Sequence, residues 1–184
     1  MEIGITIRHT AWQTALPEAR RVTRKAALAA LALTTDLPAA ASQAARPQAT
    51  ELAVVLADDA LLHALNKEYR GIDKATNVLA FAYAESESES APAFEENDVL
   101  GDVVIAFEIA RAEADQAERG LSAHLSHLVI HGVLHLLGYD HENDRDAEAM
   151  EDLEIQALAA IGISNPYASL SAETTTVQWQ KHER

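Results

Sequence analysis

The residues best suited to chemistry lie near the C-terminal end, where HLSHLVIHGVLHLLGYDH runs from His124 to His141 and holds five of the eight histidines. An α-helix turns by about 100° per residue, so the first four of these histidines would form one narrow column. For His124 and His127, a hydrogen-bonded place in the core is the favoured interpretation. His131 and His135 stand four positions apart, and such a pair can offer two ring nitrogens to one metal ion.

A third ligand follows after a glycine. Gly138 can adopt a positive φ, which ends the helix and lets the chain turn back sharply. His141 can then join His131 and His135, in the spacing H-x-x-x-H-x-x-G-x-x-H. Three neutral imidazoles would leave Zn²⁺ its full charge and one open position for water, as in catalytic zinc sites. Nickel or cobalt would accept the same three ligands.

The same spacing is typical of the metzincin proteases. In those enzymes a glutamate follows the first histidine and acts as the general base. This chain has Gly132 at that position. A zinc-dependent peptidase or amidase would therefore need a base from elsewhere in the chain, and we keep this function as an alternative.

The bulk composition indicates a globular protein. The 184 residues are 48% hydrophobic, which suits a single domain with a real core. The absence of cysteine excludes disulfides, thiolate zinc sites and cysteine nucleophiles, and it is compatible with a reducing cytosol. The N-terminal residues MEIGITIRHT lack the apolar region of a signal peptide, and the apolar run AALAALAL is too short to cross a bilayer. We expect a cytoplasmic protein without a membrane association.

The expected elements alternate between strands and helices. Apolar alternation predicts strands at 2–7, 51–57, 76–83 and 99–107. Helical periodicity and caps predict helices at 17–33, 59–70, 108–118 and 144–160, with a histidine-rich helix that begins after Ser122. This pattern favours an α/β (α+β) fold with a small mixed sheet of about four strands packed against helices. We expect one domain over residues 1–167, with a loop at 37–50, an acidic loop at 85–98 and a flexible tail at 168–184.

One part of the sequence resembles a known family. HGVLHLLGYDH closely resembles the defining motif of the YbeY family, metal-dependent endoribonucleases that act in ribosomal RNA maturation. Four further stretches between about Glu51 and Tyr167 also look like family segments in the family order. They are LNKEYRGIDKATNVLAF, VLGDVVIAFEIA, SAHLSHLVIHG and EAMEDLEIQALAAIGISNPY. The resemblance implies that His131, His135 and His141 bind zinc, and that Arg70 lies by the metal and takes part in RNA cleavage.

The resemblance also implies a biological setting. It predicts a single-strand-specific endoribonuclease in 16S rRNA 3′-end maturation and ribosome quality control, which hydrolyses RNA with a zinc-activated water. Its partners would be precursor rRNA, the small ribosomal subunit and ribosomal proteins. The oligomeric state is not readable from the sequence. A noncatalytic ribosome-assembly factor with a structural metal is the second alternative.

Charge restricts where RNA could bind. The formal net charge is −15, from 29 acidic residues against 14 lysines and arginines, and it argues against nonspecific nucleic-acid binding. RNA contact is therefore expected at a basic rim and with a strong salt dependence. The residues expected to contact RNA are Lys67, Arg70, Lys74 and His127, together with the basic cluster from Arg20 to Lys25.

Arg70 and Asp140 are each expected to have a role near the metal. The forked guanidinium of Arg70 would stabilise charge on a phosphoryl transition state, although without the resemblance a surface role at a helix end would be preferred. Asp140 is expected either to orient a ligand imidazole or to cap the turn.

The family usually has TDVLSFP where this chain has TNVLAFA. The departures at Asn77, Ala80 and Ala82 concern the cleft wall and substrate preference, and none matches a metal ligand.

Overall fold

The computed structural model describes residues 1–34, 51–83, 99–141 and 143–168. The predicted loops at 37–50 and 85–98 lie outside the described residues, as does the predicted tail from residue 169 onward. No helix within the described ranges has both the length and the apolar character needed to cross a membrane.

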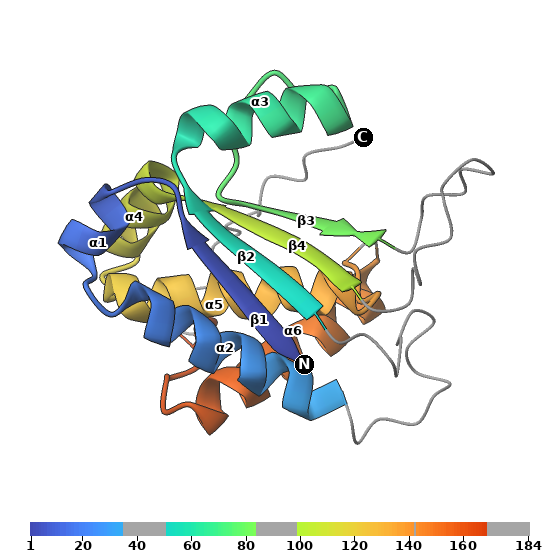
Figure 1. The fold of residues 1–184 in the computed structure, drawn as a ribbon. Coiled ribbons are helices and arrows are strands. Elements are labelled where there is room, and N and C mark those ends of the chain that lie inside the picture. Colours follow the sequence, from blue (N-terminus) through green and yellow to red (C-terminus); the bar gives the residue numbers. More distant parts are fainter. Residues whose placement is uncertain (35–50, 84–98, 142, 169–184) are drawn as a thin grey trace.

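The centre of the fold is a four-stranded sheet in the order β1-β2-β4-β3 (Figure 1). Its strands are β1 (Glu2–Ile7), β2 (Glu51–Ala57), β3 (Val78–Ala82) and β4 (Val99–Ala106). The β1–β2 and β2–β4 pairs are parallel, whereas β3 runs antiparallel to β4 at one edge. The expected mixed sheet in an α/β domain is therefore confirmed.

The helices are α1 (Ala11–Ala15), α2 (Ala19–Thr34), α3 (Asp59–Arg70), α4 (Phe107–Gln116), α5 (Leu121–Leu136) and α6 (Asp144–Ala160). Helix α1 is not expected from the sequence, because one short turn is too brief to show apolar periodicity. It is held by the buried Trp12, whose Nε1 donates to the carbonyl of Ala57 over 3.0 Å. Two helices begin two residues away from the start expected from the sequence. Helix α2 begins at Ala19 and not at about Pro17, and helix α5 begins at Leu121 and not after Ser122.

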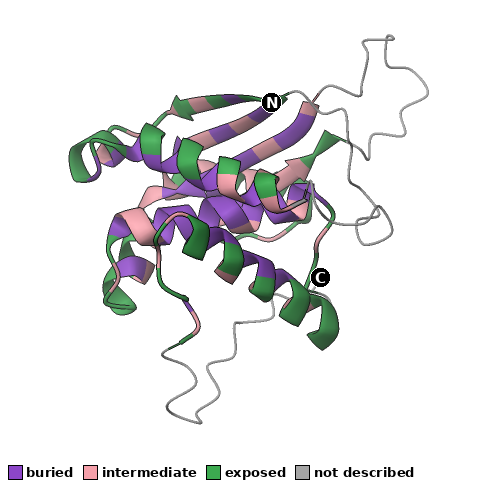
Figure 2. Ribbon diagram, turned by 90° about the horizontal axis from the view of Figure 1, so that it is seen from below, coloured by how far each residue is buried: buried purple, intermediate pink, exposed green. Residues whose placement is uncertain are grey.

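Helices cover both faces of the sheet, with α3 on one side and α2, α5 and α6 on the other (Figure 1). Successive strand residues point to opposite faces, so β4 contributes to two cores. Val104 packs with Leu62 of α3 and Leu79 of β3, whereas Val103 belongs to the larger core formed with the other helices. Figure 2 shows the buried residues concentrated between the sheet and the helices beneath it. Helix α5 lies in the middle of this layer and is buried along most of its length.

Two glycines bring the end of α5 that carries His131 and His135 close to the sheet. A Cβ at Gly132 would stand only 2.6 Å from Cγ1 of Val103, so the absence of a side chain lets α5 approach β4. Gly101 of β4 has φ +148°, and a Cβ there would stand only 2.8 Å from Cδ2 of Leu136 at the end of α5. Close backbone approach is the usual reason for glycine at such positions.

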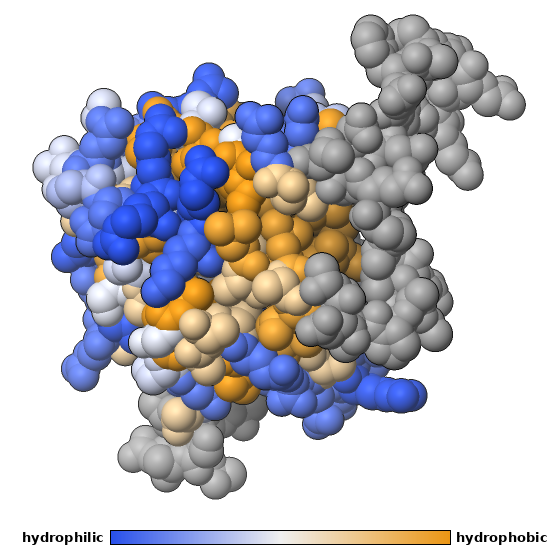
Figure 3. All heavy atoms as spheres, turned by 60° about the horizontal axis from the view of Figure 1, so that its bottom comes forward, coloured by the Kyte–Doolittle hydropathy of each residue, from blue (hydrophilic) through white to orange (hydrophobic). Residues whose placement is uncertain are grey.

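Helix α2 fixes the N-terminal part of the chain to the rest of the domain. Arg24 donates to the carbonyl of Ile3 over 3.3 Å, and Lys25 donates to the carbonyl of Ile161 over 2.9 Å. Figure 3 shows hydrophilic and hydrophobic side chains in neighbouring areas of the face on which α2 lies. Arg24 and Lys25 thus join α2 to β1 and to the end of α6.

Candidate metal centre

His131 and His135 project from the C-terminal half of α5, one helical turn apart. Their Nε2 atoms lie 3.0 Å from each other, and their ring centroids are 4.6 Å apart with the planes 82° from parallel. Two imidazoles bound to one tetrahedral ion at about 2.0–2.1 Å would hold their nitrogens about 3.3 Å apart. The observed spacing is close to that of two ligands of one ion.

The turn after α5 brings in the third histidine. Gly138 adopts φ +87°, and the amide of Tyr139 donates back to the carbonyl of Leu134 over 3.0 Å. This turn places the ring of His141 at 5.1 Å from that of His135, centroid to centroid. One potential ligand atom from each of the three histidines lies within 4.8 Å of those from the other two. We call His131, His135 and His141 the histidine triad.

The protonation and exposure of the triad fit a divalent transition metal. His131 and His135 are partly buried, and His141 is exposed, so the site opens to solvent on one side. Burial, together with the neighbouring His131 and His141, lowers the pKa of His135 to about 4. Its imidazole is therefore neutral at pH 7 and presents a lone pair. Imidazole nitrogens of this kind suit zinc, nickel, copper and iron, whereas calcium and magnesium prefer oxygen ligands.

A buried carboxylate lies behind the triad. Glu154 of α6 is 1% exposed, and its Oε1 lies 2.7 Å from Nδ1 of His131. Its Oε2 lies 2.8 Å from Nε2 of His127 and also accepts a hydrogen bond from the hydroxyl of Tyr167. The sequence does not single out Glu154, although an acid among the buried apolar residues of α6 is a signal of a paired carboxylate.

The comparison with known proteins agrees with the motif. A family model described as "Endoribonuclease YbeY" matches residues 18–162, which is more than half of the chain. The chain belongs to the YbeY family. A relative named Endoribonuclease YbeY from Paramagnetospirillum magneticum is 47% identical over 169 residues, covering 91% of this chain and 96% of the relative. A relative of the same name from Sphingopyxis alaskensis is 47% identical over 159 residues, covering 85% and 92%. The solution structure of TM1509 from Thermotoga maritima aligns over all of both chains with 20% identity and a TM-score of 0.47.

The structure shows the surroundings of two further predicted site residues of this YbeY protein, Asp140 and His127. Asp140 caps the turn, because its Oδ1 accepts from the amide of His141 over 2.7 Å. Among the described residues, Glu154 and not Asp140 binds a ligand imidazole. His127 is only 7% exposed and is engaged by Glu154 and Tyr167, an arrangement that does not favour its predicted contact with RNA.

Asn77, a departure from the usual YbeY pattern, joins three elements. Its Nδ2 donates to both carboxylate oxygens of Glu113 over 3.1 and 3.0 Å, and its Oδ1 accepts from the amide of Val78 over 2.7 Å. Nε2 of His124 lies 2.9 Å from the same carboxylate. Burial would raise the pKa of Glu113, but the hydrogen bonds from His124 and Asn77 lower it below its ordinary value. Asn77 therefore connects the start of β3 to α4, and Glu113 of α4 continues the connection to His124 of α5.

The predicted RNA-contacting cations lie at the end of α3 in this YbeY chain. Arg70 is the last residue of α3, it is exposed, and no hydrogen bond or ion pair of its guanidinium is found within the described part of the chain. Gly71, with φ +70°, closes the helix behind it. Lys67 forms an ion pair with Asp73 at 2.9 Å, and Lys74 is exposed. Arg70 is thus an exposed cation at the C-terminal end of α3.

Proposed function

We propose that this protein is a metal-dependent endoribonuclease that hydrolyses phosphodiester bonds in single-stranded RNA, with one zinc ion held by His131, His135 and His141. The observation that carries the proposal is the convergence of these three imidazoles on one point, with one side open to solvent. Membership of the YbeY family supports the RNA substrate, because the curated relatives are named endoribonucleases.

The donor set suits an anionic substrate. When bound, zinc supplies Lewis-acid chemistry: it polarises a phosphate oxygen and lowers the pKa of a water toward about 7. The three imidazoles add no negative charge, so the positive charge of the site is left for a phosphodiester. Nickel or cobalt would be held by the same nitrogens.

Arg70 is proposed to contact the phosphate during cleavage. A guanidinium offers paired N–H donors that match two phosphate oxygens, and it stays charged at any physiological pH. Its exposure leaves these donors accessible to substrate. Lys67 and Lys74, on the same end of α3 and the turn after it, would extend a basic rim along the RNA backbone.

The peptidase alternative lacks a base in the required place. Gly132, which follows the first ligand, faces Val103 of β4 and not the triad. The buried carboxylate near the triad, Glu154, already accepts hydrogen bonds from three side chains. At position 132, where a metzincin has its catalytic glutamate, this chain therefore has no carboxylate.

The biological part of the proposal follows the family resemblance. We place the activity in a single domain over residues 1–167 and propose that it acts in the cytoplasm on precursor rRNA at the 3′ end of 16S rRNA. The small ribosomal subunit and its proteins are the proposed partners in maturation and ribosome quality control. The long motif HGVLHLLGYDH supports this assignment.

One experiment separates the three candidate functions. The zinc-loaded protein is incubated with a single-stranded RNA, with the duplex of the same sequence, and with an unfolded protein substrate. We expect cleavage of the single strand only. Cleavage of the protein substrate with intact RNA would instead show a peptidase, and no cleavage of any substrate by metal-loaded protein would favour the noncatalytic assembly factor.

A further inference from the structure

The hydrogen bonds around Glu154 determine where the protons lie. Oε1 of Glu154 lies 2.7 Å from Nδ1 of His131, and its Oε2 lies 2.8 Å from Nε2 of His127 and faces the hydroxyl of Tyr167. A carboxylate surrounded by three potential donors can only accept. Burial and the charge of Glu154 raise the pKa of Tyr167, so its hydroxyl keeps its proton and donates. It follows that His131 donates through Nδ1 and His127 through Nε2.

We propose that Glu154 is the positioning residue of the histidine triad and that Tyr167 and His127 hold its carboxylate in place. With the proton of His131 on Nδ1, its Nε2 lone pair faces Nε2 of His135, the point where the two ligands meet. The opposite tautomer would put the proton on Nε2 and block coordination there. Hydrogen bonds from the other ring nitrogen commonly fix the tautomer of metal-binding histidines. This inference rests on the proposed metal site.

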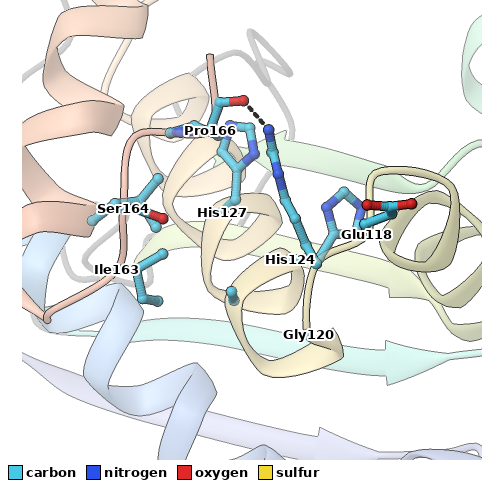
Figure 4. A pocket seen from close by; sticks show the side chains of 10 residues that line it. Glu118, Gly120, His124, His127, Ile163, Ser164 and Pro166 are labelled. Atoms are coloured by element: carbon cyan, nitrogen blue, oxygen red, sulfur yellow. Dashed lines mark hydrogen bonds between the residues drawn. The ribbon is translucent and has the colours of Figure 1, made fainter. Parts of the chain in front are cut away.

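Tyr167 reaches Glu154 because the segment after α6 is fastened to the start of α5. Figure 4 shows Pro166 of this segment next to His127 of α5, with Ile163, Ser164 and the helix-capping Gly120 lining the same pocket. The guanidinium of Arg119 donates to the carbonyl of Pro166. The amide of Tyr167 donates to Oδ1 of Asn165 over 2.7 Å, which fixes the local turn.

The ring of Tyr167 completes this attachment. It stands edge-on to the ring of His127, with centroids 5.7 Å apart and an angle of 88°. Its hydroxyl then lies against Glu154, 13 residues earlier in the chain. The C-terminal segment thereby supports the triad through Glu154 without providing a ligand of its own.

The test changes Glu154 to glutamine, which keeps the shape of the side chain but adds an amide donor. In Glu154→Gln the uncharged amide oxygen is a weaker acceptor for Nδ1–H of His131, and an amide NH₂ turned toward His131 would set one donor against another. The ring of His131 can relieve this conflict by moving its proton to Nε2. We expect zinc affinity of the metal-free protein to fall roughly 10- to 100-fold. Long-range ¹H–¹⁵N spectra should show His131 leaving the Nδ1–H tautomer.

Glu148→Gln is the matched control, because Glu148 is an exposed acid on the same helix. It should leave the zinc affinity and the His131 tautomer unchanged. Tyr167→Phe removes one donor to Glu154 and should weaken zinc binding measurably, by less than Glu154→Gln does. This second variant keeps the inference testable if Glu154→Gln fails to fold.

The outcomes distinguish this inference from the proposed function. Wild-type zinc affinity and an unchanged His131 tautomer in folded Glu154→Gln would overturn the role of Glu154. Unchanged zinc affinity in Tyr167→Phe would overturn the role of Tyr167. Failure of the wild-type protein itself to bind zinc would contradict the proposed metal site and, with it, this inference.

Discussion

Nε2 of His131 and Nε2 of His135 lie 3.0 Å apart, facing each other across one turn of α5. Two ring nitrogens with lone pairs repel at this distance unless a proton or a cation lies between them. The lowered pKa of His135 keeps that ring neutral, with a single N–H on one of its two nitrogens. A shared metal ion would satisfy the lone pairs of both Nε2 atoms at once.

Removal of the metal should leave the fold intact. The triad closes only the short turn between α5 and His141, whereas α5 itself is held by a large apolar core. We expect a chelator to abolish RNA cleavage while the far-UV circular dichroism spectrum and a cooperative thermal transition persist. Loss of the fold on chelation would instead support the structural-metal alternative.

Gly132 should be intolerant of a side chain. Alanine has the better helix propensity, by about 1 kcal/mol, but its Cβ would overlap Val103 of β4. Overpacking of this kind costs about 1–3 kcal/mol, so we expect Gly132→Ala to lower the free energy of unfolding in urea by up to about 2 kcal/mol net. Gly4→Ala is the control, since a Cβ there meets Leu52 at an ordinary 3.8 Å. Equal stability of the two variants would refute the close approach of α5 to the sheet.

Arg70→Ala should impair cleavage without affecting the metal or the fold. If Arg70 stabilises charge on the transferring phosphate, its loss should reduce the cleavage rate by about 100-fold, with Arg70→Lys intermediate. Zinc content and melting temperature should match those of the wild type, because the guanidinium has no described partner. Arg111→Ala is the control for loss of an exposed arginine, because Arg111 lies on another helix, α4, and pairs there with Asp115. Wild-type cleavage rates in Arg70→Ala would remove it from the mechanism.

The fall in the free energy of unfolding at acidic pH should depend on Glu113. Its pKa is lowered in the folded state, so its contribution to stability is present above its unfolded pKa of about 4.5 and is lost as the pH falls through the folded value. The charge and hydrogen bonds that face it come from His124, Asn77 and His127. We expect Glu113→Gln to be less stable than the wild type at pH 6, with a difference that shrinks toward pH 3. A difference that stays constant with pH would show that the carboxylate charge is not involved.

The sequence predicts the ligands of the site better than their supports. The i, i+4 spacing and the glycine turn are local features, so His131, His135 and His141 can be read from the motif, as can the strands and most helices. Glu154 and Tyr167 reach His131 through the packing of α6 and of the segment after it, which sequence spacing does not encode. The sequence left two local alternatives for Asp140, and the structure shows the cap of the turn. The contact between Glu154 and the ring of His131 depends on the tertiary structure. Helix α1 is missed because Trp12 holds it by a distant contact with β2.

The most direct test of the account measures bound metal and RNA cleavage together, in the wild type and in His141→Ala. His141 is exposed, so its removal should leave the core unchanged while taking one ligand from the triad. The account predicts one zinc per wild-type chain and cleavage of single-stranded RNA that a chelator abolishes and zinc restores, with both metal and cleavage lost in His141→Ala. Full cleavage by His141→Ala, or by wild-type protein stripped of metal, would contradict it.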